Sequence, residues 1–346
     1  MTMNGGVMPR SEIEGKDNSS EDKSNYKVVC KGDMVYNSMR MWQGANGVSN
    51  YDGIVSPAYT VLMPTEEIDN QYFAALFKTS NLINAFRKNS QGLTSDTWNL
   101  KYPQIRPIRL YIPSLQEQTK ISSFIGMLEE RIGKQRQLVA ALKKYKRGLH
   151  KLVFIKNRKP SWEKSALHDI ASFCGGGTPS KDVSSYWEGE IGWISSSDIQ
   201  EEWIDNISVT RRITKTAIDN SATKLCPEGT IAIVSRVGVG KVAIMPESLC
   251  TSQDFTNITS ITGNTHYMAY QIAFRMKLEA MKTQGTSIKG VTADTIKAML
   301  LDIPPLEEQK KIADMLTAFD AYIKRAVCEL DLFLAMKKAL LQQLFI

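Results

Sequence analysis

Histidine and cysteine, the residues that most often build metal centres and nucleophilic sites, are sparse in this chain. Its 346 residues include three histidines, and none stands with cysteine or carboxylate at the spacing of metal ligands. The five cysteines are scattered, and no two form a Cys-x-x-Cys pair. We therefore expect free thiols in a reducing compartment and no metal site.

Long apolar runs are also missing. No run approaches the roughly 18 residues that span a membrane, and the opening Met-Thr-Met-Asn-Gly-Gly lacks the basic and apolar pattern of a secretion signal. The sequence thus predicts a cytoplasmic protein without a membrane segment. Apolar residues still make up 42% of the chain, enough for buried cores in the two or three domains that its length suggests.

Several segments resemble catalytic or nucleotide-binding motifs, but each lacks residues that the motif requires. The run from Val237 to Val242 resembles a phosphate-binding loop, but that motif needs glycine where Ser235 stands and serine or threonine where Val242 stands. A tight turn between strands explains it better. The glycine-rich run 175–180 lacks dinucleotide-site spacing, although as a flexible loop it can approach a phosphate or a base edge. Ser195–Asp198 has no histidine nearby to activate a nucleophile. We predict a chain without catalytic activity of its own.

What the chain does contain is a long internal repeat. Ile112–Phe154 recurs as Ile303–Phe345, and both copies begin with Ile-Pro, continue with Glu-Gln and then place apolar residues at steps of four and three. This spacing predicts two long helices whose apolar seams meet, with antiparallel pairing as the simplest closure. The expected seam consists of Ile121, Ile125, Leu128, Ile132, Val139, Leu142, Leu149, Ile312, Leu316, Phe319, Ile323, Leu330, Phe333 and Leu340.

Polar residues interrupt this seam at matching steps. Lys146 in the first copy and Lys337 in the second are expected to set the register of pairing, as buried polar groups do in coiled coils. The alternative is two separate helices, each packing on its own domain.

Positive charge is concentrated in the first of these helices. The formal net charge is +7, and residues 116–158 alone carry 11 basic and 3 acidic groups. Such a helix predicts a surface for phosphate or an acidic partner. A merely solvated helix face is the alternative interpretation.

Two globular modules precede and separate the helices. Strand-like runs at 191–194, 230–234 and 242–245, followed by a helix at 267–282, predict a mixed α/β and mainly antiparallel second module. The first module repeats the later part of the second, including a helix at 71–88, but has a shorter front. The expected segments are 1–111 for the N-terminally shortened first module, 112–158 for a central helical spacer, 159–302 for the second module and 303–346 for a C-terminal helical spacer.

These features resemble the specificity subunit of type I restriction-modification systems. The likeness rests on two divergent modules, each closed by Ile-Pro-x-Leu-x-Glu-Gln and a heptad helix. Trp162-Glu…Leu167, the Gly-Gly-Gly-Thr-Pro-Ser run at 175–180 and the run at 32–45 also resemble segments of that family's target recognition domain. The resemblance covers nearly the whole chain.

The resemblance implies an α+β fold in which two mixed α/β target recognition domains are separated by two long helices that form an antiparallel coiled coil. It implies a subunit that reads a bipartite site on double-stranded DNA. Its partners would be two modification (methyltransferase) subunits and restriction (translocase/endonuclease) subunits. S-adenosylmethionine, ATP and Mg would act in those partners, with no cofactor in this chain.

Candidate contact residues are loop residues able to read base edges or hold phosphates, because hydrogen bonds from such side chains distinguish base pairs. Each also fits a plain turn, and Trp42 also fits a core position. The candidates for DNA binding are Arg40, Trp42, Gln43, Lys88, Gln91, Thr94, Ser95, Asn99, Thr178, Ser180, Lys181, Ser196, Ser197, Arg236, Lys241, Gln284, Thr286, Ser287 and Lys289.

Two other function classes stay open at this stage. A structural adaptor, such as a truncated or inactive specificity subunit, would join partners through the same coiled coil without reading DNA. A self-contained enzyme is disfavoured by the missing motifs.

Overall fold

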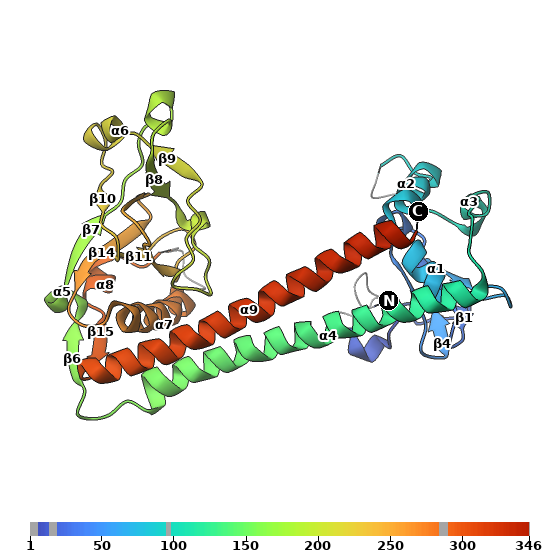
Figure 1. The fold of residues 1–346 in the computed structure, drawn as a ribbon, viewed down its shortest axis with the longest axis horizontal. Helices are drawn as coiled ribbons and strands as arrows, with labels where there is room; N and C mark the ends of the chain where they lie inside the picture. The colour runs from blue at the N-terminus through green and yellow to red at the C-terminus, as the bar shows by residue number, and fades with distance from the viewer. Residues whose placement is uncertain (1–5, 14–18, 95–97, 284–289, 346) are drawn as a thin grey trace. The chain divides into compact units, whose positions relative to one another are not determined.

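The computed structural model describes residues 6–13, 19–94, 98–283 and 290–345. The chain divides into two compact units, one formed by residues 1–139 and 326–346 and the other by residues 140–325. We call them unit 1 and unit 2. Two long helices, α4 (Leu115–Lys151) and α9 (Leu306–Leu344), each contribute one segment to each unit (Figure 1).

The main sheet of unit 1 has three strands. In it β2 (Met34–Asn37) pairs antiparallel with both β3 (Asn46–Val48) and β5 (Tyr59–Leu62). A separate ribbon joins β1 (Lys27–Val29) to β4 (Gly53–Val55). The buried core joins the β2 side chains to the following helices and to both long helices, whose contributions include Ile125 of α4 and Leu341 of α9.

The helical part of unit 1 differs from the prediction. In place of one helix at 71–88, the chain forms α1 (Asn70–Leu76) and α2 (Ser80–Asn89). The break occurs because Thr79 takes an extended backbone (φ −73°, ψ 150°), which ends one helix and precedes the next. Three further short helices are η1 (Arg10–Glu12), η2 (Met41–Gln43) and α3 (Tyr102–Ile105).

Unit 2 contains two four-stranded sheets and a smaller ribbon. The first sheet has the order β12 (Val242–Ile244), β11 (Ile231–Val234), β14 (Phe255–Ile261) and β7 (Ala171–Gly175), all antiparallel. The second has the order β10 (Leu225–Cys226), β13 (Leu249–Thr251), β8 (Ile191–Ile194) and β9 (Arg211–Ile213). Strands β8 and β13 run parallel, whereas β6 (Glu163–Ala166) and β15 (Leu300–Ile303) form an antiparallel ribbon. The predicted strands at 191–194, 230–234 and 242–245 are confirmed to within one residue at either end.

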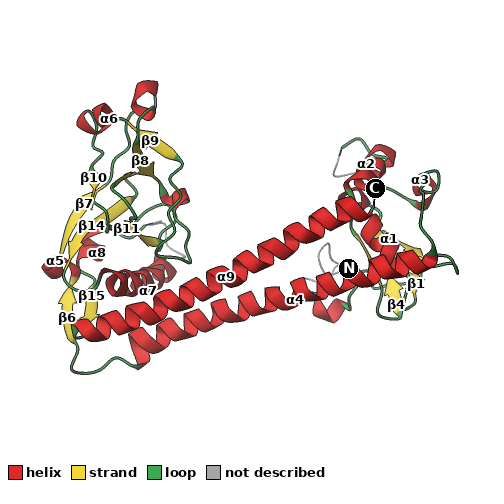
Figure 2. Ribbon diagram, viewed as in Figure 1, coloured by secondary structure: helices red, strands yellow, loops and turns green. Residues whose placement is uncertain are grey.

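Helix α7 (Thr265–Thr283) covers one side of the first sheet in unit 2 (Figure 2). Its buried Tyr267 and Met268 share a core with Ile231 and Val242, and the apolar seam of both long helices closes this core through Leu149 and Leu316. The remaining short helices are η3 (Leu152–Lys156), α5 (Leu167–Ile170), η4 (Ser184–Trp187), η5 (Ser196–Asp198), α6 (Lys215–Asp219) and α8 (Ala293–Lys297).

The two units share one strand plan, as the sequence predicts. The order β3-β2-β5 in unit 1 corresponds to β12-β11-β14 in unit 2, and every pair is antiparallel. Gly32 and Gly229 precede the central strands with φ of 97° and 80°, a backbone region that favours glycine. A helix follows the third strand in each unit.

The long helices pair in an antiparallel manner within each unit. In unit 1 the Gln135 amide donates to the Ala326 carbonyl at 2.9 Å, and Lys337 forms an ion pair with Glu129. In unit 2 Lys146 lies 2.6 Å from the Asp320 carboxylate. Along these contacts the residue numbers on α9 decrease as the residue numbers on α4 increase, which confirms the predicted antiparallel coiled coil. All the predicted seam residues are buried or half-buried.

Two further properties concern the whole described chain. Within the residues that the structure describes, no helix is both long and apolar enough to cross a membrane. The five cysteines are free, as expected.

Candidate nucleic-acid interface

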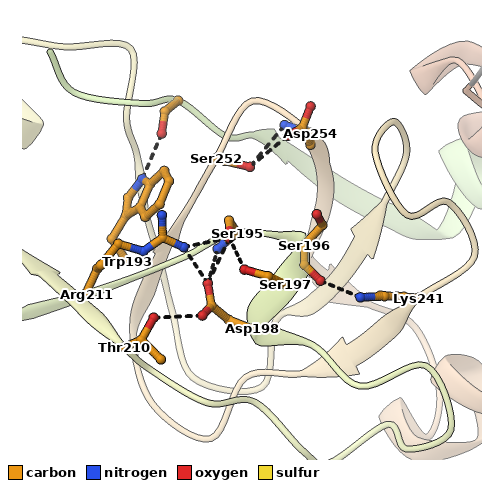
Figure 3. Close-up of polar contacts among 11 residues, drawn as sticks. Trp193, Ser195, Ser196, Ser197, Asp198, Thr210, Arg211, Lys241, Ser252 and Asp254 are labelled. Carbon is orange, nitrogen blue, oxygen red and sulfur yellow. Dashed lines mark hydrogen bonds and ion pairs between the residues drawn. The ribbon is translucent and has the colours of Figure 1, made fainter. Parts of the chain in front are cut away.

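The loops that follow β7, β8, β11 and β13 meet in unit 2. The Gly177 amide donates to the Thr251 carbonyl at 2.8 Å, and the Ser235 amide donates to the Asp254 carbonyl at 2.8 Å. Lys241 Nζ donates to the Ser196 carbonyl at 2.7 Å. These bonds join four loops into one surface, which we call the loop edge: residues 175–180, 195–198, 235–241 and 252–254, with Arg211 at the start of β9 (Figure 3).

Asp198 organises the first part of the loop edge. This buried carboxylate accepts from the Ser195 amide at 2.7 Å, from the Thr210 hydroxyl at 2.8 Å and from Arg211 at 2.7 Å. Burial is the largest single influence and opposes ionisation, but the hydrogen bonds together outweigh it and lower the pKa of Asp198. The aspartate is therefore charged and holds the turn rigid.

Arg211 is held on three sides yet stays partly open. Its Nη2 also donates to Ser195 Oγ at 2.6 Å, and its guanidinium carbon lies 4.5 Å from the ring centroid of the buried Trp193. The indole N–H of Trp193 in turn donates to the Gly177 carbonyl at 2.9 Å. The side chain of Arg211 is 38% exposed. An arginine fixed in this way presents its remaining N–H donors in one orientation.

The β11–β12 connection is the tight turn that the sequence predicts. Gly238 and Gly240 have φ of 83° and 102°, and the flanking strands pair antiparallel. Gly238 lies against the Ser196 side chain, so the turn packs on the Ser195–Asp198 loop. Arg236, at the base of the turn, is exposed.

The glycine-rich run 175–180 packs closely on neighbouring backbone from the end of β7 onward, which corrects the expectation of a flexible loop. A Cβ at Gly176 would collide with the Ser252 carbonyl oxygen, and one at Gly177 would collide with the backbone of Ala222. The Thr178 hydroxyl donates to the Gln253 side chain, and the Ser180 carbonyl accepts from the Trp187 indole at 3.0 Å. The glycines therefore allow close backbone packing.

The structure brings many of the predicted contact residues of unit 2 together. The loop edge contains Thr178, Ser180, Ser196, Ser197, Arg236 and Lys241, and the exposed Lys181 follows it directly. Four candidates, Gln284, Thr286, Ser287 and Lys289, lie outside the described residues. Val291, which follows them, donates its amide to the Ser235 carbonyl at 2.8 Å. Sequence reasoning missed Arg211, Asp198, Trp193 and Gln253, because their partners are set by strand pairing between distant segments.

Unit 1 carries a second, smaller group of candidate residues. The rings of Trp42 and Trp98 meet edge to face at 5.2 Å, and the Arg87 guanidinium lies 5.7 Å from the Trp42 ring centroid. Gln91 and Asn99 pair through their backbones at 3.0 and 2.8 Å. Arg40, Trp42, Gln43 and Asn99 are half-buried, Lys88, Gln91 and Thr94 are exposed, and Ser95 lies outside the described residues. The sequence named Lys88 and missed its neighbour Arg87.

The basic stretch of α4 is partly neutralised within unit 2. Lys143 lies 2.6 Å from the Glu202 carboxylate, and Lys146 pairs with Asp320 and donates to the Glu202 carbonyl at 2.6 Å. Lys144, Arg147 and Lys151 remain exposed. The unpaired positive charge on this part of α4 is therefore smaller than the net charge of residues 116–158 suggests.

In the described part of the chain, metal-binding side chains are not clustered, and the thiols of Cys226 and Cys250 are buried. No three histidine, cysteine, aspartate or glutamate side chains there are grouped as metal ligands. Burial raises the pKa of Cys226 to about 12 and that of Cys250 to about 11, so both thiols stay protonated near neutral pH.

Part of unit 2 and the adjoining start of the last α9 segment match a known protein family. Residues 160–327 match the family model described as the type I restriction modification DNA specificity domain. This range contains the whole loop edge.

The curated relatives that the chain matches are named as specificity subunits of type I restriction enzymes. The chain is 34% identical over 167 residues to the type I restriction enzyme MjaIX specificity subunit of Methanocaldococcus jannaschii, covering 47% of this chain and 39% of the relative. It is 29% identical over 245 residues to the EcoR124I/EcoR124II specificity subunit of Escherichia coli, covering 67% of this chain and 59% of the relative. The chain thus aligns with less than two thirds of either relative.

A solved structure shares the fold over almost its full length. The type I restriction-modification system S subunit from M. genitalium superposes with a TM-score of 0.61 at 13% identity, over 99% of this chain and 92% of that one. This likeness supports the observed combination of mixed α/β regions and paired long helices.

Proposed function

We propose, from the match of residues 160–327 to the type I restriction modification DNA specificity domain, that the chain is the DNA sequence-recognition subunit of a type I restriction-modification complex. Each unit reads one half of a bipartite target on double-stranded DNA in the cytoplasm. The observation that carries this proposal is the loop edge, where four loops and Arg211 form one polar surface within the family domain.

The chemistry of the loop edge suits base reading. Its exposed or half-exposed groups include the Arg211 and Arg236 guanidinium groups, the Lys241 ammonium and the Ser197 hydroxyl. Arginine can bind guanine through two hydrogen bonds, and lysine and serine add phosphate and base contacts. The bonds that rigidify Arg211 remove conformational freedom before DNA arrives, which favours discrimination between bases.

The long helices are proposed to dock two modification (methyltransferase) subunits. Large apolar side chains stay exposed on their outer faces, among them Phe124, Met127 and Leu332 in unit 1 and Met315 and Tyr322 in unit 2. Exposed apolar residues at helical spacing are typical of a surface that a partner helix covers. Restriction (translocase/endonuclease) subunits are proposed to join this assembly.

We further propose that this chain contributes no catalytic group. S-adenosylmethionine is expected in the modification subunits, and ATP and Mg in the restriction subunits. The residues of the loop edge hold and orient DNA, because their polar groups are arranged for hydrogen bonding.

Mapping methylated adenines across the source genome, with and without this gene, tests the proposal. The expected result is loss of methylation at one bipartite motif when the gene is removed. A companion strain with Arg236→Ala should relax one half of that motif and leave the other half intact. An unchanged methylation map after gene removal would show that the chain does not direct modification.

A further inference from the structure

A basic cavity lies in unit 2 beside the loop edge. Its volume is about 440 Å³, and its walls come from the Ala140–Lys151 segment of α4, from α7 and from residues 201–203. We call it the α4–α7 pocket. Sites for small ligands commonly have volumes of about 300–1,000 Å³, so the pocket is large enough for a phosphate group with its attached sugar.

The side chains that line the α4–α7 pocket carry more positive than negative charge. Lys143 and Lys146 line it, but each is paired with a carboxylate at 2.6 Å. Arg147 and Lys277 also line it, and neither forms an ion pair within the described part of the chain. Glu201 is the single lining carboxylate there that lacks a cationic partner. Two uncompensated cations against one carboxylate favour an anionic ligand.

A buried polar atom in the same pocket also lacks a partner. His150 Nε2 is shielded from solvent and has no hydrogen bond in the structure. Burial, followed by the charges of Lys146 and Lys277, lowers the pKa of His150 to about 3. The imidazole is therefore neutral and can offer an N–H from Nε2 to an acceptor oxygen.

One wall of the pocket is fixed by an aromatic clamp. Trp203 is buried, and the ammonium groups of Lys146 and Lys324 lie 4.6 and 5.3 Å from its ring centroids. Lys324 is itself held by Asp205 at 2.5 Å. The clamp keeps residues 201–203 against α4, so the pocket has a defined shape before any ligand binds.

We propose that the α4–α7 pocket binds a phosphate group, and that this phosphate belongs to the backbone of the duplex on the loop edge. Val239 lines the pocket and lies in the same β11–β12 turn as Arg236 and Lys241. The pocket and the loop edge are therefore continuous. Such a contact positions the protein along the duplex without reading bases. The inference rests on the proposed DNA-binding function.

The test compares two double variants of the full chain. Arg147→Ala with Lys277→Ala removes both uncompensated cations of the pocket. Lys144→Ala with Lys151→Ala removes the same charge from exposed positions of α4 that do not line it. Binding to a random-sequence duplex and to the mapped target duplex is measured by fluorescence anisotropy across a salt series.

The pocket variant should lose the same factor of affinity, about tenfold or more, for both duplexes. Its plot of log affinity against log salt should flatten by about 1, the change expected for one lost phosphate contact. The control should keep most of its affinity. Equal losses in the two variants, or none in either, would overturn the phosphate site. If the wild type still binds the target duplex more tightly than the random duplex in that case, the proposed function is unaffected and only the phosphate site is wrong.

A second arm distinguishes the source of the phosphate. Inorganic phosphate and adenosine monophosphate are titrated against the wild type and the pocket variant, with thermal unfolding as the readout at matched ionic strength. We expect each phosphate ligand to raise the unfolding temperature of the wild type slightly and to leave that of the pocket variant unchanged. If a free nucleotide stabilises only the wild type while duplex binding is equal in both proteins, the assignment to the DNA backbone is wrong.

Discussion

Gln118 and Gln309, which stand at equivalent positions of the sequence repeat, make the same hydrogen bonds in different units. Gln118 accepts from the Asp69 amide at 3.0 Å and donates to the Pro113 carbonyl at 3.0 Å. Gln309 accepts from the Asn264 amide at 2.8 Å and donates to the Pro304 carbonyl at 2.8 Å. Each glutamine thus fastens the start of a long helix to the start of the helix in its own module.

These glutamines should therefore contribute strongly to stability. Both are buried, so Gln309→Leu keeps the approximate volume but leaves the Asn264 amide and the Pro304 carbonyl without their partner. A loss of about 1–3 kcal/mol in the free energy of unfolding is expected from urea denaturation. Gln342→Leu, on an exposed position of α9, is the control and should change little. A similar small change in both variants would contradict the anchoring role.

The buried ion pair between Lys146 and Asp320 gives a second prediction. Their side chains are 13% and 3% exposed, and Asp320 also accepts from the Tyr270 hydroxyl at 3.0 Å. Burial raises the pKa of Asp320 and lowers that of Lys146, because both charges are removed from water. Asp320→Asn leaves the lysine charge buried without its partner and should cost about 3–5 kcal/mol of unfolding free energy.

The control for that variant is the exposed pair of Lys310 and Glu307 on α9, whose charged groups lie 3.0 Å apart. Glu307→Gln should change the unfolding free energy by about 0–1 kcal/mol, since solvent screens exposed pairs. If Asp320→Asn proved as mild as Glu307→Gln, the pair would not stabilise the junction of the long helices in unit 2.

The pH dependence of stability should report on His150. Its pKa is about 3 in the folded chain against an ordinary value of 6.5, so the unfolded chain binds the extra proton between these values. Protonation of His150 therefore has no effect on the free energy of unfolding above pH 6.5. As pH falls from 6.5 toward 3, proton uptake by the unfolded chain lowers that free energy, and this loss is the pH dependence due to His150. His150→Phe removes it and keeps the ring contacts with Phe154 and Tyr270, both at 5.9 Å.

Unfolding free energies of the two proteins are compared from pH 7 to pH 4 in buffers without phosphate. The difference should move in favour of the variant by about 1.4 kcal/mol per pH unit below pH 6. Parallel curves for wild type and variant would show that His150 titrates alike in the folded and unfolded chain.

Arg211 should determine specificity in the half-site that unit 2 is proposed to read. Lysine at this position keeps the charge but cannot reproduce the donor geometry that Asp198, Ser195 and Trp193 fix. Arg211→Lys in the assembled complex should reduce discrimination at one position of that half-site by about 1–3 kcal/mol, measured by competition with single-base variants of the target. Weakening that is uniform over both half-sites would indicate a phosphate contact.

The helical repeat and the strands of unit 2 could be predicted because their signals are local. Apolar steps of four and three fix a helix seam, and short β-branched runs such as 231–234 fix buried strands. The two helices α1 and α2 were expected as one, since the extended backbone at Thr79 follows no local breaker such as proline or glycine.

The candidate site was only partly predictable for a different reason. Loop residues such as Ser196 and Lys241 stood out through their polar, glycine-rich surroundings. Arg211 and Asp198 did not, because their pairing depends on β8 and β9 lying side by side, with Trp193 opposite Arg211. The compensation of Lys143 by Glu202 was equally hidden, since it joins residues far apart in sequence.

Competition binding tests the central claim most directly. The chain is assembled with the proposed modification subunits, and labelled duplex carrying the mapped target is challenged with unlabelled target or random duplex. Sequence recognition predicts that the target competes better than random DNA by a factor of about 10³ or more. Equal competition by random duplex would contradict the account and leave a coiled-coil adaptor that joins subunits without reading sequence.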